Sequence, residues 1–119
     1  MNELIAHLFG DYVLQNHWMA NKKTNSDLAA WCHVLCYMIP FLFLTNKFLP
    51  LFVIVITHLY IDRFRLARYW VELYGVGRKG LLFDTDIPNP PDYLSVWLLI
   101  IVDNTFHLTI NHLALGYLQ

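Results

Sequence analysis

The sequence predicts an all-α, polytopic membrane protein whose helices form one four-helix bundle over residues 1–119. The first observation behind this prediction is composition, since 57% of the residues are hydrophobic and only 14% are charged. A soluble domain has about 25% charged residues, and a chain this short buries the smallest fraction of its surface. The second observation is that apolar runs near bilayer-crossing length recur along the chain.

Composition also excludes several classes of protein. A formal net charge of -1 argues against a strongly basic nucleic-acid binder, so we expect no nucleic-acid partner. Two cysteines are too few for a secreted disulfide framework. Disordered chains contain few aromatic residues, so an aromatic content of 16% excludes a disordered protein. The expected partners are membrane lipids, and a homo-oligomer is possible.

The N-terminal helix is expected over residues 2–20 and is the shortest and most polar of the four. Its apolar surface is interrupted by His7, Asp11, Asn16 and His17. Such a segment could be a short span packed inside the bundle, a re-entrant helix or an interfacial helix.

Residues 28–46 form the clearest spanning candidate, because the run approaches the ~20 apolar residues that a bilayer requires. Asn25 and Ser26 are good helix N-cap types, and Asp27 suits the first turn. Pro40 predicts a kink, which a membrane helix tolerates better than a soluble one.

Two further helices complete the bundle. The third begins with the apolar run 51–61 and continues through the basic, aromatic segment 62–70, as a helix does on leaving the hydrocarbon. Prolines predict a polar loop over 76–92. The last helix is expected over 93–118.

The basic residues indicate an orientation in the membrane. With four spans, the first and third connections lie on one side and hold nearly all of them, while the other side holds only Lys47. The positive-inside rule then predicts a multi-pass inner-membrane protein with both termini outside. The residues are Lys22, Lys23, Arg63, Arg65, Arg68, Arg78 and Lys79. Five of them could hold an anionic substrate or lipid headgroup, or they could be ordinary positive-inside charge, namely Arg63, Arg65, Arg68, Arg78 and Lys79.

Three segments place a histidine and an aspartate four residues apart, on one helix face. Two read His-Leu-aromatic-x-Asp, and the third, in the last helix, reads in reverse. Because the last helix would run antiparallel to the other two, the three pairs would lie at matching depths, aspartates in one layer and histidines in the next. His33 could join the histidine layer. The pairs are His7 and Asp11, His58 and Asp62, and Asp103 and His107.

Ionisable groups at such depth cost ~2.5–3.5 kcal/mol each, so they must face the bundle interior and meet partners. Imidazole and carboxylate together suit Zn, Mn or Fe. We therefore expect a divalent metal site, either two metals or one metal with outer His–Asp pairs, with Asp11 and Asp62 as catalytic residues. A metal-free structural core or proton relay is the alternative. The predicted ligands are His7, Asp11, His33, His58, Asp62, Asp103 and His107.

The chain also resembles a family of small integral membrane proteins of bacteria and phages, known only as a domain of unknown function. The pattern H-L-x-G-D-x-x-L-Q-x-x-W-M-A-x-x-K runs from His7 to Lys23, and Thr57–Arg63 and Val96–His107 resemble later motifs. The resemblance implies a compact helical membrane protein with the same His/Asp set. It implies no established activity.

The sequence thus leads to a hypothesis of function. The expected protein is an integral membrane metal-dependent hydrolase, whose lipid-linked or phosphorylated substrate enters from the basic face. The alternative is a non-enzymatic membrane module, either a pore or transporter or a binder of a phage or host protein, with a polar His/Asp core.

Overall fold

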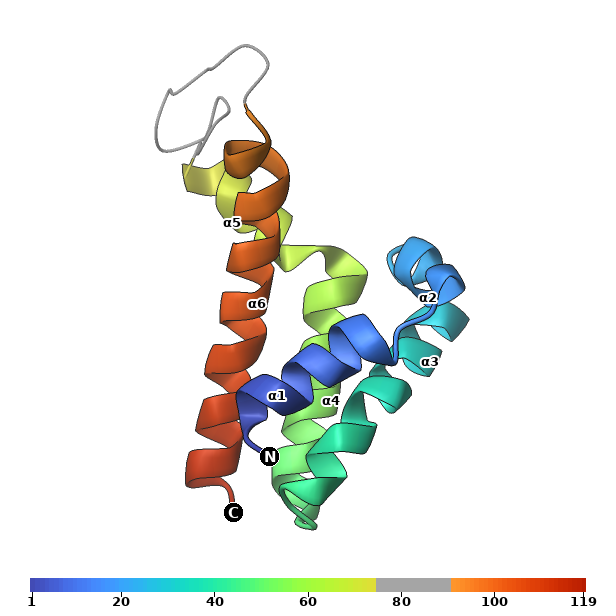
Figure 1. Ribbon diagram of the computed structural model, residues 1–119, viewed down its shortest axis with the longest axis vertical. Coiled ribbons are helices and arrows are strands. Elements are labelled where there is room, and N and C mark those ends of the chain that lie inside the picture. The colour runs from blue at the N-terminus through green and yellow to red at the C-terminus, as the bar shows by residue number, and fades with distance from the viewer. Residues whose placement is uncertain (75–90) are drawn as a thin grey trace. The chain divides into compact units, whose positions relative to one another are not determined.

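The computed structural model describes residues 1–74 and 91–119, and all regular structure in them is helical (Figure 1). The all-α prediction is therefore confirmed. By contact, the chain divides into a first unit, Met1–Phe64 with His107–Gln119, and a second unit, Arg65–Phe106. The elements are α1 (Glu3–Leu8), the π-helix η1 (Phe9–Val13), α2 (His17–Lys22), α3 (Asp27–Met38), the 3-10 helix η2 (Ile39–Phe43), α4 (Phe48–Phe64), α5 (Leu66–Tyr74) and α6 (Asp92–Tyr117).

The N-terminal segment is not the single helix expected over residues 2–20. Helix α1 leads directly into η1, and a new helix, α2, begins after Asn16, whose side-chain oxygen accepts a hydrogen bond from the backbone N–H of Met19 at 2.8 Å. An N-cap of this kind starts a helix in a new direction. The eleven residues of α1 and η1 extend roughly 16 Å, about half of a bilayer core.

Helix α3 begins where its sequence predicts and changes at Pro40, but it does not extend to residue 46 as expected. The Ser26 hydroxyl accepts from the backbone N–H of Ala29 and caps the first turn. At the other end the α-helix stops at Met38 and continues as the 3-10 helix η2. The cause is Pro40, which has no N–H to donate to the carbonyl of Cys36.

The third predicted helix is interrupted. Helix α4 ends at Phe64, and Arg65 has a φ of 53°, in the left-handed region that breaks a helix. The expectation of a continuous helix through 62–70 was therefore wrong, and α5 is a separate helix in the second unit. At the end of α4, Arg63 donates to Asp27 at 2.9 Å and to the Thr24 carbonyl, which joins α4 to the turn before α3.

The last helix agrees with its predicted bounds within a residue. The preceding loop, with the basic residues Arg78 and Lys79, lies almost entirely in 75–90, outside the described residues. Because of the two breaks, the described residues contain six α-helices where the sequence predicted four.

One helix in the described residues is long and apolar enough to cross a membrane, namely Ser95–Tyr117 of α6. The apolar helix Asp27–Phe43 is shorter than this length. One C-terminal helix could therefore cross a membrane, while the three clear spans expected from the sequence are not shown.

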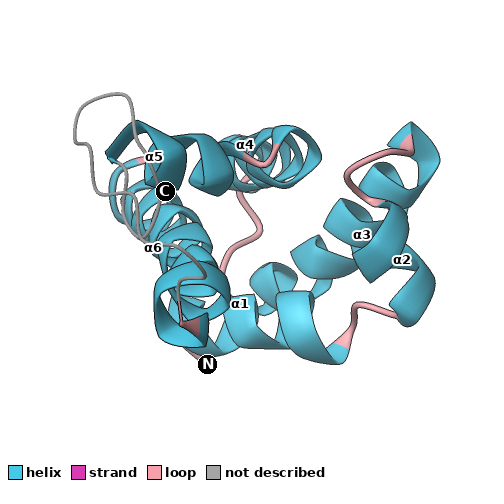
Figure 2. Ribbon diagram, turned by 90° about the horizontal axis from the view of Figure 1, so that it is seen from above, coloured by secondary structure: helices cyan, strands magenta, loops and turns pink. Residues whose placement is uncertain are grey.

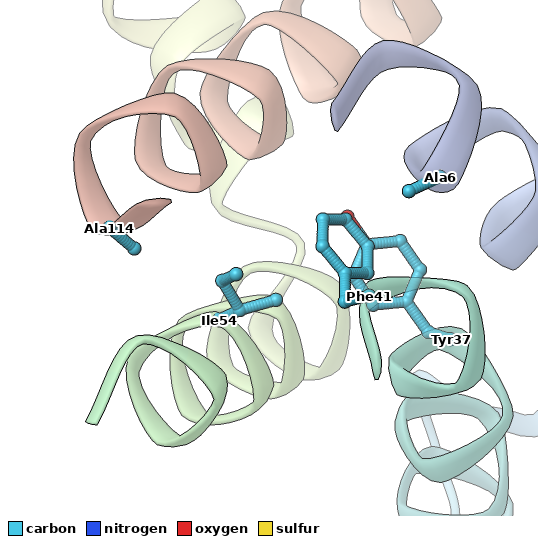
Figure 3. Packing of buried hydrophobic residues seen from close by; sticks show 5 residues of the cluster. All are labelled: Ala6, Tyr37, Phe41, Ile54 and Ala114. Atoms are coloured by element: carbon cyan, nitrogen blue, oxygen red, sulfur yellow. The ribbon is translucent and has the colours of Figure 1, made fainter. Parts of the chain in front are cut away.

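The first unit has a small apolar core and many buried polar side chains. Helix α1 contacts α3 through His7 and Tyr37, and it contacts the part of α6 in this unit through Glu3 and His112. Figure 2 shows α2 beside α3, which it contacts. The apolar core of this unit consists of Ala6, Tyr37, Phe41, Ile54 and Ala114 (Figure 3). Beside it are buried polar side chains, namely His7, Asp11, His33, Thr45, His58, Asp62, His107 and Asn111.

The outside of the same unit is apolar. Leu28, Phe43 and Phe48 are 67%, 77% and 78% exposed. Large apolar side chains are therefore exposed on this unit, while the histidines and aspartates named above are buried in it.

Gly10 in η1 lies where no side chain fits. A Cβ there would overlap the Tyr37 ring and come within 3.1 Å of the Tyr37 Cα. We predict that Gly10→Ala lowers the melting temperature of the purified protein, at a cost of about 1–3 kcal/mol. The matched control is Gly116→Ala, since a Cβ at Gly116 meets nothing within 4 Å. Equal melting temperatures for the two variants would contradict this packing.

Candidate metal centre

Four buried side chains of the first unit converge in an inner cluster. Asp11 comes from η1, His33 from α3, and His58 and Asp62 from successive turns of α4. One ligand atom from each lies within 4.8 Å of all the others. These four groups could therefore hold a metal ion.

The distances within the inner cluster are short and even. The His33 Nε2 atom lies 3.3 Å from Asp11 Oδ1 and 3.0 Å from Asp62 Oδ2. The His58 Nε2 atom lies 3.2 Å from each of the same two oxygens. The two Nε2 atoms are 3.0 Å apart.

These spacings match a metal's coordination shell. A tetrahedral ion with bonds of about 2.0–2.1 Å places neighbouring ligand atoms about 3.3 Å apart. An octahedral ion with bonds of about 2.1 Å places adjacent ones about 3.0 Å apart. The five distances given above are compatible with either geometry.

Unsatisfied buried atoms point to the same centre. Asp11 Oδ1 has no hydrogen-bond partner among the described residues, although two imidazole nitrogens lie within 3.3 Å of it. The Nδ1 atoms of His33 and His58 also lack partners there. No contact at Nδ1 prevents either ring from carrying its proton there, and in that tautomer each Nε2 presents a lone pair to a cation.

An outer pair of histidines contacts the other oxygen of each carboxylate. His7 Nδ1 lies 3.5 Å from Asp11 Oδ2, and His107 Nε2 lies 3.2 Å from Asp62 Oδ1. Each aspartate therefore has one oxygen toward the inner cluster and one toward an outer histidine. Contacts of this kind orient metal-ligating side chains.

Tyr37 links the inner cluster to the outer pair of histidines. Its ring stacks on His58, with centroids 3.6 Å apart and planes at 22°. Its hydroxyl accepts from Asn111 Nδ2 at 2.7 Å and lies 2.9 Å from His7 Nδ1. One side chain of α3 thus connects α1, α4 and α6.

A lysine reaches the inner cluster from its rim. Lys23 Nζ lies 2.6 Å from Asp62 Oδ2 and 3.4 Å from His33 Nε2. Its side chain is 18% exposed, whereas those of Asp62 and His33 are 5% and 1% exposed.

A family model matches residues 1–115, nearly the whole chain. Its description is "Protein of unknown function (DUF3307)". The chain belongs to the DUF3307 family. The resemblance inferred from the sequence motifs is thereby confirmed. No curated protein and no solved structure matches this chain.

Six of the seven predicted ligands of this DUF3307 chain lie in the first unit, arranged as the inner cluster and the outer pair. Asp103 belongs to the second unit; it is half-buried and one turn before His107 on α6. The assignment of Asp103 as a metal ligand stays a prediction. The expected separation into an aspartate layer and a histidine layer was wrong, because the inner cluster mixes both residue types.

Lys23 and Tyr37 contact predicted ligands and Asn111 contacts Tyr37, but none of the three is among the predicted ligands. Asn111 shares the polar face of the last helix with His107, and Tyr37 follows His33 by four residues, as Asp11 follows His7, so the same spacing could have indicated Tyr37. Lys23 closes the motif that begins at His7, although the positive-inside rule assigns it only to membrane-flanking charge.

Tyr37→Phe tests the link between the inner cluster and the outer pair of histidines. The variant keeps the ring on His58 but deprives His7 and Asn111 of a buried hydroxyl partner, so we expect a loss of about 1–3 kcal/mol. Thermal unfolding measures it. Tyr60→Phe is the control, because Tyr60 is exposed and should change stability by less than about 0.5 kcal/mol. Equal effects of the two variants would argue against the network.

Proposed function

We propose that this protein is an integral membrane metalloprotein that hydrolyses a phosphorylated or lipid-linked substrate with a metal held by its inner cluster. The observation that carries the proposal is the convergence of Asp11, His33, His58 and Asp62 within 4.8 Å. Two carboxylates and two imidazoles suit Zn, Mn or Fe.

The number of protein ligands decides which metal ions would leave a coordination position free for water and substrate. A tetrahedral Zn²⁺ would be saturated by the four residues, as in structural zinc sites. An octahedral ion would keep two positions for water and substrate. We therefore propose Mn²⁺ or Fe²⁺ for the enzymatic role. Such an ion supplies a Lewis acid and an acidified water when bound.

The protein's own residues would bind and move protons around that ion. The inner oxygens of Asp11 and Asp62 and the two Nε2 atoms hold it. The outer oxygen of Asp11 contacts His7 and that of Asp62 contacts His107, so a proton that an aspartate takes from a water in the site would pass to the histidine beside it. We assign Asp11 and Asp62 the catalytic proton transfer.

The membrane location is supported by large apolar side chains on the surface of the first unit and ionisable side chains in its interior. Exposed Leu28, Phe43 and Phe48 would face lipid, while the buried polar cluster lies in the protein interior, where intramembrane ionisable groups belong. Helix α6 is long enough to cross a membrane. We propose a multi-pass arrangement in the inner membrane, with both termini outside.

A non-enzymatic module is the second candidate, and a specific contact favours it. Lys23 lies 2.6 Å from Asp62, so it gives the cluster a way to balance charge without metal. The His/Asp core would then only hold helices together or conduct protons. Metal binding separates the two candidates.

The metal site is tested by Asp62→Asn, which preserves shape but removes the ligand charge. We expect purified wild-type protein to hold about one Mn or Fe per chain by elemental analysis, and the variant far less. At a hundredfold excess over Kd the metal should stabilise the wild type by ~2.7 kcal/mol. Asp27→Asn is the control, because the Asp27 side chain is 84% exposed. Wild-type protein with under ~0.1 metal per chain and no metal-dependent stabilisation would refute the proposal.

Alkaline carbonate extraction of cell membranes tests the location. A protein with helices embedded in the hydrocarbon stays in the pellet, whereas one held by charge is released. We expect this chain to stay in the pellet. Its recovery in the supernatant, folded without detergent, would rule out the integral membrane proposal.

A further inference from the structure

Lys23 has a position that the proposed metal site does not require. Its ammonium contacts Asp62 Oδ2 at 2.6 Å and His33 Nε2 at 3.4 Å, and both are atoms assigned to the metal. Its side chain is also more exposed than those it contacts. Lys23 therefore connects the ligand atoms to the rim of the site.

A count of charges shows what the loaded site would need. Within the inner cluster, the carboxylates of Asp11 and Asp62 balance the two charges of a divalent ion, and the Lys23 ammonium in contact with Asp62 adds one positive charge. An isolated charge in a poorly hydrated site is costly unless an opposite charge joins it. A singly charged anion would complete the site.

The metal and the ammonium compete for the same oxygen. A divalent ion bound to Asp62 Oδ2 repels an ammonium that lies 2.6 Å from that oxygen. The lysine stem is flexible, with rotatable donors at its end. The Lys23 side chain is 18% exposed, more than the side chains it contacts, so the ammonium can move toward the rim of the site.

We propose that Lys23 and the metal together form a binding site for a singly charged phosphoryl group. Metal binding moves the Lys23 ammonium from Asp62 to the phosphoryl oxygens, so the lysine selects the anion that the metal receives. This inference rests on the proposed metal site and adds the residue that recognises the phosphoryl group. A lipid headgroup and a free phosphate share this chemistry.

The test measures binding, not turnover. Manganese-loaded protein in phospholipid-free detergent is titrated with inorganic phosphate and, separately, with phosphatidylglycerol, while ³¹P relaxation reports proximity to Mn²⁺. Wild type is compared with Lys23→Met and Lys23→Arg. Lys47→Met is the matched control, because Lys47 is an exposed lysine outside the cluster.

We expect Lys23→Met to weaken phosphoryl binding about tenfold or more, since a charge-assisted hydrogen bond is lost. Its manganese affinity should equal or exceed that of wild type, because a competing cation is gone. Lys23→Arg should restore phosphoryl binding, and Lys47→Met should behave as wild type. Phosphatidylglycerol relaxation without an effect of free phosphate identifies a lipid headgroup, and the converse identifies a free phosphate.

Two results overturn the inference. Equal phosphoryl binding by wild type and Lys23→Met, with manganese bound in both, refutes the role of Lys23 but leaves the metal site intact. Absence of manganese binding in every variant refutes the proposed function, and this inference with it. If Lys23→Met does not fold, Lys23→Gln, which can still hydrogen-bond Asp62, takes its place in the titration.

Discussion

Two buried carboxylates set the main constraint on the first unit. Each ionised group costs several kcal/mol to remove from water unless a partner of opposite charge or a donor meets it. Asp11 and Asp62 meet His33 and His58 on one side and an outer histidine on the other. The helices that supply these partners must therefore pack together in one arrangement, which the small apolar core alone would not specify.

The local backbone serves this arrangement. The π-helix η1 carries Asp11, and Gly10 beside it allows the backbone to approach Tyr37 closely. The cap at Asn16 turns the chain into α2, and the turn that follows brings Lys23 to Asp62. Breaks that look irregular in the N-terminal segment are thus what bring its polar side chains to the cluster.

Much of the site could be predicted from the spacing of four between histidines and aspartates, because that spacing fixes a shared helix face whatever the fold. Helix α3 and its change at Pro40 were predictable for a similar reason, since caps and proline act locally. The break at Arg65 was not, because a left-handed φ at a non-glycine residue leaves little trace in the sequence. Lys23 was missed because its partner, Asp62, is 39 residues away.

X-ray absorption spectroscopy at the metal edge of the purified, membrane-extracted protein tests the central claim most directly. The account predicts a bound first-row divalent metal with nitrogen and oxygen ligands at about 2.0–2.2 Å and the outer-shell scattering of two imidazoles. A spectrum with sulfur ligands, with no imidazole scattering, or with no metal edge above background would contradict it.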